Sequence, residues 1–251
     1  MQKLKETYHE IERNLGGHIE PLESVQLVEE YRRYWKPEKV RVILLAESHV
    51  FTSDEDRRIV IPQIDDLPGY PTRYARFVYC LGYGEKTLTK NPHHPQRDGT
   101  PQFWKLLHCC NNPILPLKDF WHVQGRTPSR QRLRNKIALL KNLKAKGVWL
   151  VDASIVALYR EGEKDPKMAE VLRKSWESYT RQVITSASPG HVICVGKGVA
   201  SIVEDDLRGL FPGRYTVISQ PNARRHVKKS LEDFRKKQME NFQMYYKICN
   251  P

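Results

Sequence analysis

Four short runs of β-branched and other apolar residues recur along the chain, separated by longer stretches with helical spacing of apolar positions. The runs cover residues 40–45, 148–151, 191–195 and 215–218. Each is short enough for a strand that is buried on both faces, and strands that alternate with helices indicate a parallel sheet covered on both sides. We therefore expect an α/β protein with three layers, α/β/α, around a central, mainly parallel four-stranded sheet.

The helical stretches can be placed between these runs. Two helices are predicted before the first strand, with a break at Gly16-Gly17 between them. Pro101 opens another helix, and further helices are expected over residues 167–186 and 199–210. Residues 51–101 show little periodicity and many turn formers, and a loop of this length in a compact domain is usually functional.

Length and composition set the domain organisation. A chain of 251 residues with 39% hydrophobic content can bury one large core, so we expect an α/β domain over residues 38–251 preceded by a helical extension over residues 1–37. No window of about 18 apolar residues is present and the N-terminus is polar, which predicts an intracellular protein, in the cytoplasm or with the nucleic acid of the cell, that does not enter a membrane. The five cysteines are scattered without metal-binding spacing, so we expect reduced thiols and neither a metal nor a cofactor.

The charge is strongly basic and clustered. A formal net charge of +13 favours phosphate-bearing partners. The helix expected before residue 148 carries Arg130 and Arg134 on an outer face that is predicted to be wholly cationic. A second cluster follows the last strand and contains Arg224, Arg225 and Lys228. Two such clusters favour the backbone of DNA or RNA as the partner.

Polar residues follow each of the four predicted strands. They are Glu47-Ser48-His49, Asp152, Lys197 and the segment from Gln220 to Asn222. The carboxyl ends of parallel strands share one edge, where open α/β sheets place their ligands, so we expect these groups to meet in one cleft. Lys197 stands between two glycines without the spacing of a phosphate loop. The glycines are expected to let a helix N-terminus approach the sheet, and Lys197 to contact a nucleic-acid phosphate.

This order of motifs resembles the uracil-DNA glycosylase superfamily. Residues 39–49 are similar to its first motif, residues 147–154 to its middle strand and residues 218–224 to its second motif, so the similarity spans roughly residues 38–240. The resemblance implies a uracil-DNA glycosylase-like fold and a base that is flipped into the cleft and stacked on an aromatic side chain. It also implies that the base departs when its N-glycosidic bond is hydrolysed.

The resemblance assigns four catalytic positions. Glu47 matches the residue that positions or activates the attacking water, and Ser48 stands where the family often has Asp, Asn or Ala. His49 replaces a proline and adds a second titratable group. Gln220 replaces the histidine that stabilises the departing base, and a neutral donor stabilises it less. These departures imply that catalysis is slower, altered or absent.

Base recognition is expected to depend on Asp152, which stands where the family has a base-reading Asn. An Asn donates one hydrogen bond and accepts another, as the edge of uracil requires, whereas an ionised Asp only accepts. Asp152 therefore disfavours uracil unless it is protonated, and favours a base edge rich in N–H groups; a simple capping role is the alternative. Phe77, with Phe51 as a second candidate, is expected to stack on the base, and Asn222 to contact it.

The predicted function is that of a divergent DNA glycosylase-like protein. It would bind nucleic acid and excise a flipped, modified base other than ordinary uracil. Two alternatives stay open. One is a catalytically weak or inactive nucleic-acid-binding module of the same fold, and the other is a small-substrate hydrolase that uses Glu47 and His49 as acid and base.

Overall fold

The computed structural model describes residues 1–15, 19–89, 99–114, 117–125, 127–160, 163–164, 167–220 and 231–251. At its centre is a sheet of four parallel strands in the order β2-β1-β5-β6. The strands are β1 (Val42–Ala46), β2 (Val148–Asp152), β5 (His191–Val195) and β6 (Tyr215–Ile218). The four apolar runs of the sequence are these strands, and the expected four-stranded parallel sheet is confirmed.

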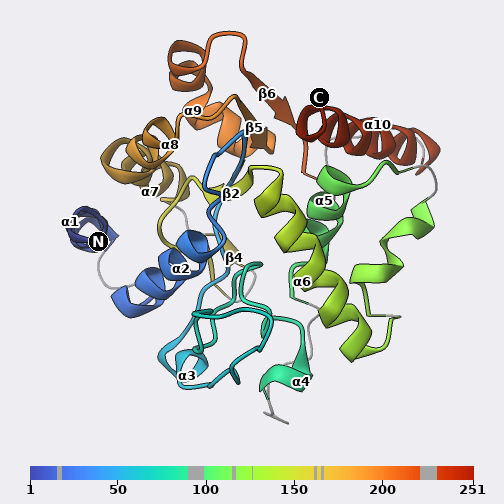
Figure 1. Ribbon diagram of the computed structural model, residues 1–251. Helices are drawn as coiled ribbons and strands as arrows, with labels where there is room; N and C mark the ends of the chain where they lie inside the picture. The colour runs from blue at the N-terminus through green and yellow to red at the C-terminus, as the bar shows by residue number, and fades with distance from the viewer. Residues whose placement is uncertain are drawn as a thin grey trace.

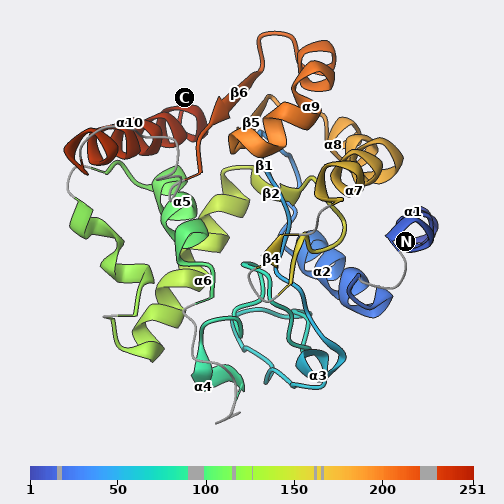
Figure 2. The ribbon, with the colours of Figure 1, turned by 180° about the vertical axis from the view of Figure 1, so that it is seen from behind.

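Helices cover both faces of the sheet, as Figures 1 and 2 show from opposite sides. One layer contains α5 (Pro101–Asn111), α6 (Ser129–Ala145) and α10 (Leu231–Cys249). The other contains α1 (Gln2–Leu15), α2 (Leu22–Tyr34), α7 (Met168–Ser175), α8 (Arg181–Ala187) and α9 (Lys197–Leu210), with a π-helical turn, Trp176–Thr180, between α7 and α8. The three-layer α/β/α architecture is therefore confirmed. Within the described residues, no helix combines the length and apolarity needed to cross a bilayer.

The remaining elements are short and lie mainly in the connections. They are α3 (Asp54–Arg57), α4 (Lys86–Thr89), the 3₁₀ helix η1 (Leu117–Val123), and a two-stranded ribbon of β3 (Tyr159–Arg160) and β4 (Glu163–Lys164). Of the long loop predicted between residues 51 and 101, the described part contains only α3, α4 and the start of α5.

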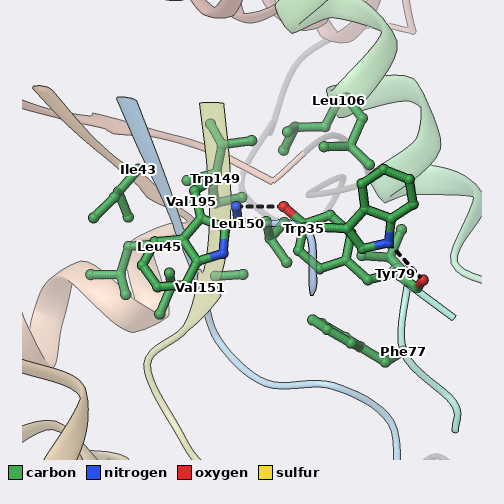
Figure 3. Close-up of a cluster of buried hydrophobic side chains, with 14 of the residues drawn as sticks. Trp35, Ile43, Leu45, Phe77, Tyr79, Leu106, Trp149, Leu150, Val151 and Val195 are labelled. Atoms are coloured by element: carbon green, nitrogen blue, oxygen red, sulfur yellow. Dashed lines mark hydrogen bonds between the residues drawn. The ribbon is translucent and has the colours of Figure 1, made fainter. Parts of the chain in front are cut away.

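The loop that follows β1 closes the edge of the sheet. Figure 3 shows the Tyr79 side chain beside β2, where its hydroxyl accepts the N–H of Leu150 at 2.7 Å. The backbone carbonyl of Tyr79 in turn accepts the indole N–H of Trp35 at 3.3 Å. A backbone N–H on an edge strand that is buried must find such a partner. Tyr79 therefore ties the long loop to the strand that ends in Asp152.

The two N-terminal helices, predicted as an extension, belong to the main core. Leu4 and Tyr8 of α1 and Val28 and Tyr31 of α2 are buried in the same cluster as the sheet. The hydroxyl of Tyr31 also donates to the backbone carbonyl of Arg73 at 2.6 Å. These helices therefore hold the loop after β1 in place as well as covering the sheet.

The basic helix α6 corrects one prediction. Arg130 and Arg134 are exposed as expected, but Lys136 is only 2% exposed. Its ammonium group lies 2.7 Å from the buried carboxylate of Glu85, which also accepts two hydrogen bonds from Arg132. The prediction of a wholly cationic outer face was therefore wrong, because the loop before α5 supplies a carboxylate to this helix. The exposed cations are confined to a narrower stripe.

Candidate functional site

The carboxyl ends of the strands bring the predicted polar groups to one edge of the sheet. Ala46 pairs in register with Asp152, and the N–H of Ser154 donates to the carbonyl of Glu47 at 3.0 Å. On the other side of β1, α9 begins at Lys197 directly after β5. Gln220 follows two residues after the end of β6. This common edge is the candidate functional site.

His49 occupies the centre of the site and is completely buried between two carboxylates. Its Nε2 atom lies 2.5 Å from Oε1 of Glu20, and its Nδ1 atom lies 3.3 Å from Oδ2 of Asp152. Burial by itself lowers the pKa of His49, but the charges of Glu20 and Asp152 and their hydrogen bonds outweigh it and raise the pKa to about 9. At neutral pH the ring is an imidazolium that donates to both carboxylates.

This arrangement corrects the catalytic role predicted for His49. A protonated ring with both N–H groups donated has no lone pair with which to accept a proton. His49 instead fixes the orientation of Asp152 and neutralises part of its charge. The alternative of a small-substrate hydrolase, with Glu47 and His49 as acid and base, stays a prediction.

Glu20 is a member of the site that the sequence analysis missed. It precedes α2 and is completely buried. Besides His49, its carboxylate accepts the backbone N–H of Ala157 at 2.7 Å and that of Thr52 at 3.3 Å. These two residues lie in the loops that follow β2 and β1. One carboxylate therefore holds both loops of the site to the N-terminal helical layer.

A chain of alternating charges continues behind Asp152. The Nη2 atom of Arg32 lies 3.9 Å from Oδ2 of Asp152, and its Nη1 atom lies 2.8 Å from Glu29. Burial alone raises the pKa of Glu29, but the charge of Arg32 and hydrogen bonds from Arg33 and Tyr179 lower it below its usual value. Buried charges are tolerated only when they are paired in this way. Asp152 is therefore flanked by a cation on either side.

A narrow pocket opens in front of Asp152. Its lining consists of Ser48, His49, Arg76, Phe77, Val78, Thr100, Phe103, Leu150 and Asp152. The ring of Phe77 meets His49 edge to face, with centroids 6.2 Å apart. The hydroxyl of Thr100, at the start of α5, is buried and makes no hydrogen bond with any described residue. About 10 Å³ is accessible to water, roughly the space of one molecule, so a larger ligand requires the walls to move.

Glu47 and Gln220 lie on the other side of the site, at the N-terminus of α9. The carboxylate of Glu47 accepts the hydroxyl of Tyr159 at 3.2 Å, and burial together with Glu47 raises the pKa of Tyr159 to about 12. A Cβ atom on Gly198 would lie 3.5 Å from Glu47, and one on Gly196 would lie 3.0 Å from the Cγ atom of Gln220. The glycines around the exposed Lys197 thus let the helix approach both side chains, as their positions in the sequence suggested.

The other predicted site residues have different outcomes. Ser48 lines the pocket, and its hydroxyl accepts the N–H of Leu158 at 3.2 Å. Phe77 also lines the pocket, whereas Phe51 is not part of its lining, so its predicted stacking position is not supported. Among the described residues, no group of three or more potential ligands is arranged to hold a metal ion. Four predicted contacts lie outside the described residues: Asn222, Arg224, Arg225 and Lys228.

Comparison with known proteins leaves the resemblance to glycosylases as a prediction. No family model matches the chain, and no match was found among curated proteins or solved structures. The functional argument therefore depends on the site itself.

Proposed function

We propose that the protein binds nucleic acid, admits a flipped base to the pocket in front of Asp152 and hydrolyses its N-glycosidic bond, with a modified base other than ordinary uracil as the substrate. The observation that carries this proposal is the position of Asp152. Its carboxylate lies in the lining of a pocket that also contains Phe77, at the sheet edge that carries Glu47. The sequence motifs that resemble uracil-DNA glycosylases support the same reaction class.

The surroundings of Asp152 favour a base edge rich in N–H groups. His49 and Arg32 flank the carboxylate of Asp152 with positive charge, and a carboxylate offers a base only acceptors of hydrogen bonds. An ionised carboxylate facing a carbonyl oxygen of a base would place two acceptors against each other. Thr100 adds a hydroxyl that is unpaired within the described structure and can donate or accept on the opposite wall. Bases that present two adjacent donors satisfy this lining better than uracil.

The chemistry requires a water molecule at the sugar and a donor at the departing base. In the proposed reaction, Glu47 orients the water and accepts its proton while the oxygen attacks C1′ of the sugar. The bond between C1′ and the base nitrogen breaks, and its electron pair leaves with the base. Gln220, on the other side of the Gly196-Lys197-Gly198 turn, donates to the base as charge develops on it. His49 takes no proton in this scheme.

Replacing Glu47 with Gln is expected to reduce base release by roughly 10²-fold or more, because the amide cannot accept the proton of the attacking water. Binding should change much less. The measurement is single-turnover release of free base from duplexes that each carry one modified base, with E170Q on the exposed face of α7 as the matched control. If the wild-type protein releases none of these bases, the hydrolytic part of the proposal is wrong. A gel shift with the same duplexes then tests the alternative of a binding module without catalysis.

Replacing Arg130 and Arg134 with Ala is expected to weaken binding to all nucleic-acid sequences alike. Both side chains are exposed near the start of α6, which leads antiparallel into β2 and so begins on the side where the strands end. Loss of two phosphate contacts should reduce the slope of log Kd against log salt by about 2. The control removes the same charge from the opposite layer, with Lys3→Ala and Lys5→Ala on α1. If the slope of log Kd against log salt is the same for the two double variants, α6 is not part of the nucleic-acid interface.

A further inference from the structure

A second cavity, which shares no lining residue with the pocket of Asp152, lies between α5, η1 and α6. Helices α5 and α6 lie side by side in Figure 2. Its volume is about 520 Å³, within the range of pockets that hold small molecules. Three basic side chains, Lys105, Arg132 and Lys136, are part of the lining, and none of the described lining residues is acidic. The backbone at Gly84 and Gly125 forms another part of the wall. The sequence analysis did not predict this site.

The three basic residues differ in the interactions that they already make. The ammonium of Lys136 is held by Glu85 at 2.7 Å and lies 4.5 Å from the ring centroid of Trp104. Arg132 uses three of its five N–H groups in bonds to Glu85 and to the carbonyl of Thr127, which leaves two N–H groups beside the cavity. Lys105 is half-buried and lies 5.7 Å from the ring centroid of Phe120. Within the described part of the chain, it forms no ion pair.

This distribution of charge favours an anion. Glu85 supplies one negative charge to the buried Lys136 and the partly buried Arg132, and Lys105 adds a third positive charge at the cavity. Partly desolvated cations are stabilised by an anionic partner, and a guanidinium with a lysine ammonium matches the oxygens of a phosphate. Among the residues that the structure describes, the cavity lining has no carboxylate that would repel such a group.

We propose that this cavity binds a phosphomonoester, held by Lys105 and by the remaining N–H groups of Arg132. Lys136 and Glu85 position Arg132 rather than contact the ligand. The group could be supplied by a free small molecule or by the 5′ end of a polynucleotide, since both present the same dianionic phosphate. The site lies away from Asp152 and does not depend on base excision.

The test is a titration of the full-length protein with inorganic phosphate at constant ionic strength, followed by ³¹P nuclear magnetic resonance. Saturable binding is expected, with Lys105→Ala weakening it by roughly tenfold or more because a charge-assisted hydrogen bond is lost. Lys105→Arg should retain most of the affinity. Lys141→Ala, which removes an exposed charge from α6, and Asp152→Asn in the other pocket should leave phosphate binding unchanged.

Two results would overturn the site. One is the absence of saturable phosphate binding, and the other is an equal loss of affinity in Lys105→Ala and Lys141→Ala, which would indicate general surface charge. A second arm compares a short single strand with and without a 5′-phosphate. A preference for the phosphorylated strand that Lys105→Ala removes would identify the polynucleotide end as the source. Equal binding of both strands, with inorganic phosphate still bound, would identify a small phosphomonoester.

Discussion

Raising the pH from 6 to 10 is expected to destabilise the folded protein by about 3 kcal/mol through His49 alone. The folded-state pKa of His49 is about 9, whereas the ordinary value is 6.5. A group whose pKa is raised by folding contributes stability that is fully present below the unfolded value and is lost as the pH rises through the folded value. A difference of between two and three pKa units corresponds to about 3 kcal/mol. More than half of this loss should occur before pH 8.

The measurement is urea unfolding at a series of pH values, with His49→Gln as the matched variant. Glutamine can still donate to one carboxylate but does not titrate. The free energy of unfolding of the variant should therefore be lower than that of the wild type at pH 6, and the two should converge near pH 10. The other ionisable groups, the five buried cysteines among them, are the same in both proteins, so the difference between the two curves isolates His49. Parallel curves would show that His49 does not carry its charge in the folded state.

The part of the site that the sequence could predict is the part that depends on strand position. Glu47, Asp152 and Gln220 each follow an apolar run, and parallel strands align their ends at one edge. Phe77 could be proposed as a pocket residue because it is an aromatic in the long loop. Phe51, the second candidate for stacking on the base, is also an aromatic residue of this loop. The sequence pattern does not show which of the two lines the pocket.

The part that could not be predicted depends on ion pairs between distant segments. Glu20 lies in the connection between two helices, where an acidic residue is normally exposed, and no periodicity relates it to His49. One signal could have indicated such a partner, because a histidine directly after a buried strand requires hydrogen-bonding groups for both nitrogens. Lys136 could not be predicted for the same reason. The run of basic residues predicts that its side chain is exposed, but it is buried in an ion pair with Glu85.

The C-terminal helix α10 was missed for a different reason. Phe242, Tyr245 and Cys249 have the three- and four-residue spacing of a buried helical face, and they are buried. The run of charged residues at the beginning of the helix indicates nucleic-acid binding rather than a buried helical face. Phe242 packs against Phe120 of η1 with ring centroids 5.1 Å apart, so this helix also contacts the 3₁₀ helix that precedes α6.

Replacing Asp152 with Asn is expected to shift base preference toward uracil by up to about 10⁴-fold relative to a base that presents two donors. Polar pockets discriminate at this level because the wrong ligand leaves buried groups unpaired. The Asn amide can donate to a carbonyl oxygen of uracil, and its oxygen can still accept the Nδ1 hydrogen of His49. Glu20 retains its contact with His49, so the fold of the pocket should persist, which thermal unfolding of the variant checks.

The measurement is Kd for strands that contain uracil, hypoxanthine or an amino-bearing base, each with wild type and variant. Asp205→Asn, an equal charge change on an exposed residue of α9, is the control and should leave the preference unchanged. Entry of a base must first displace the walls of the narrow pocket, and for a given base this cost is the same in wild type and variant, so it cancels when the two proteins are compared. The ratio of the two affinities therefore reports the contact at Asp152. Tightest binding of uracil by the wild type would show that this carboxylate does not read the base.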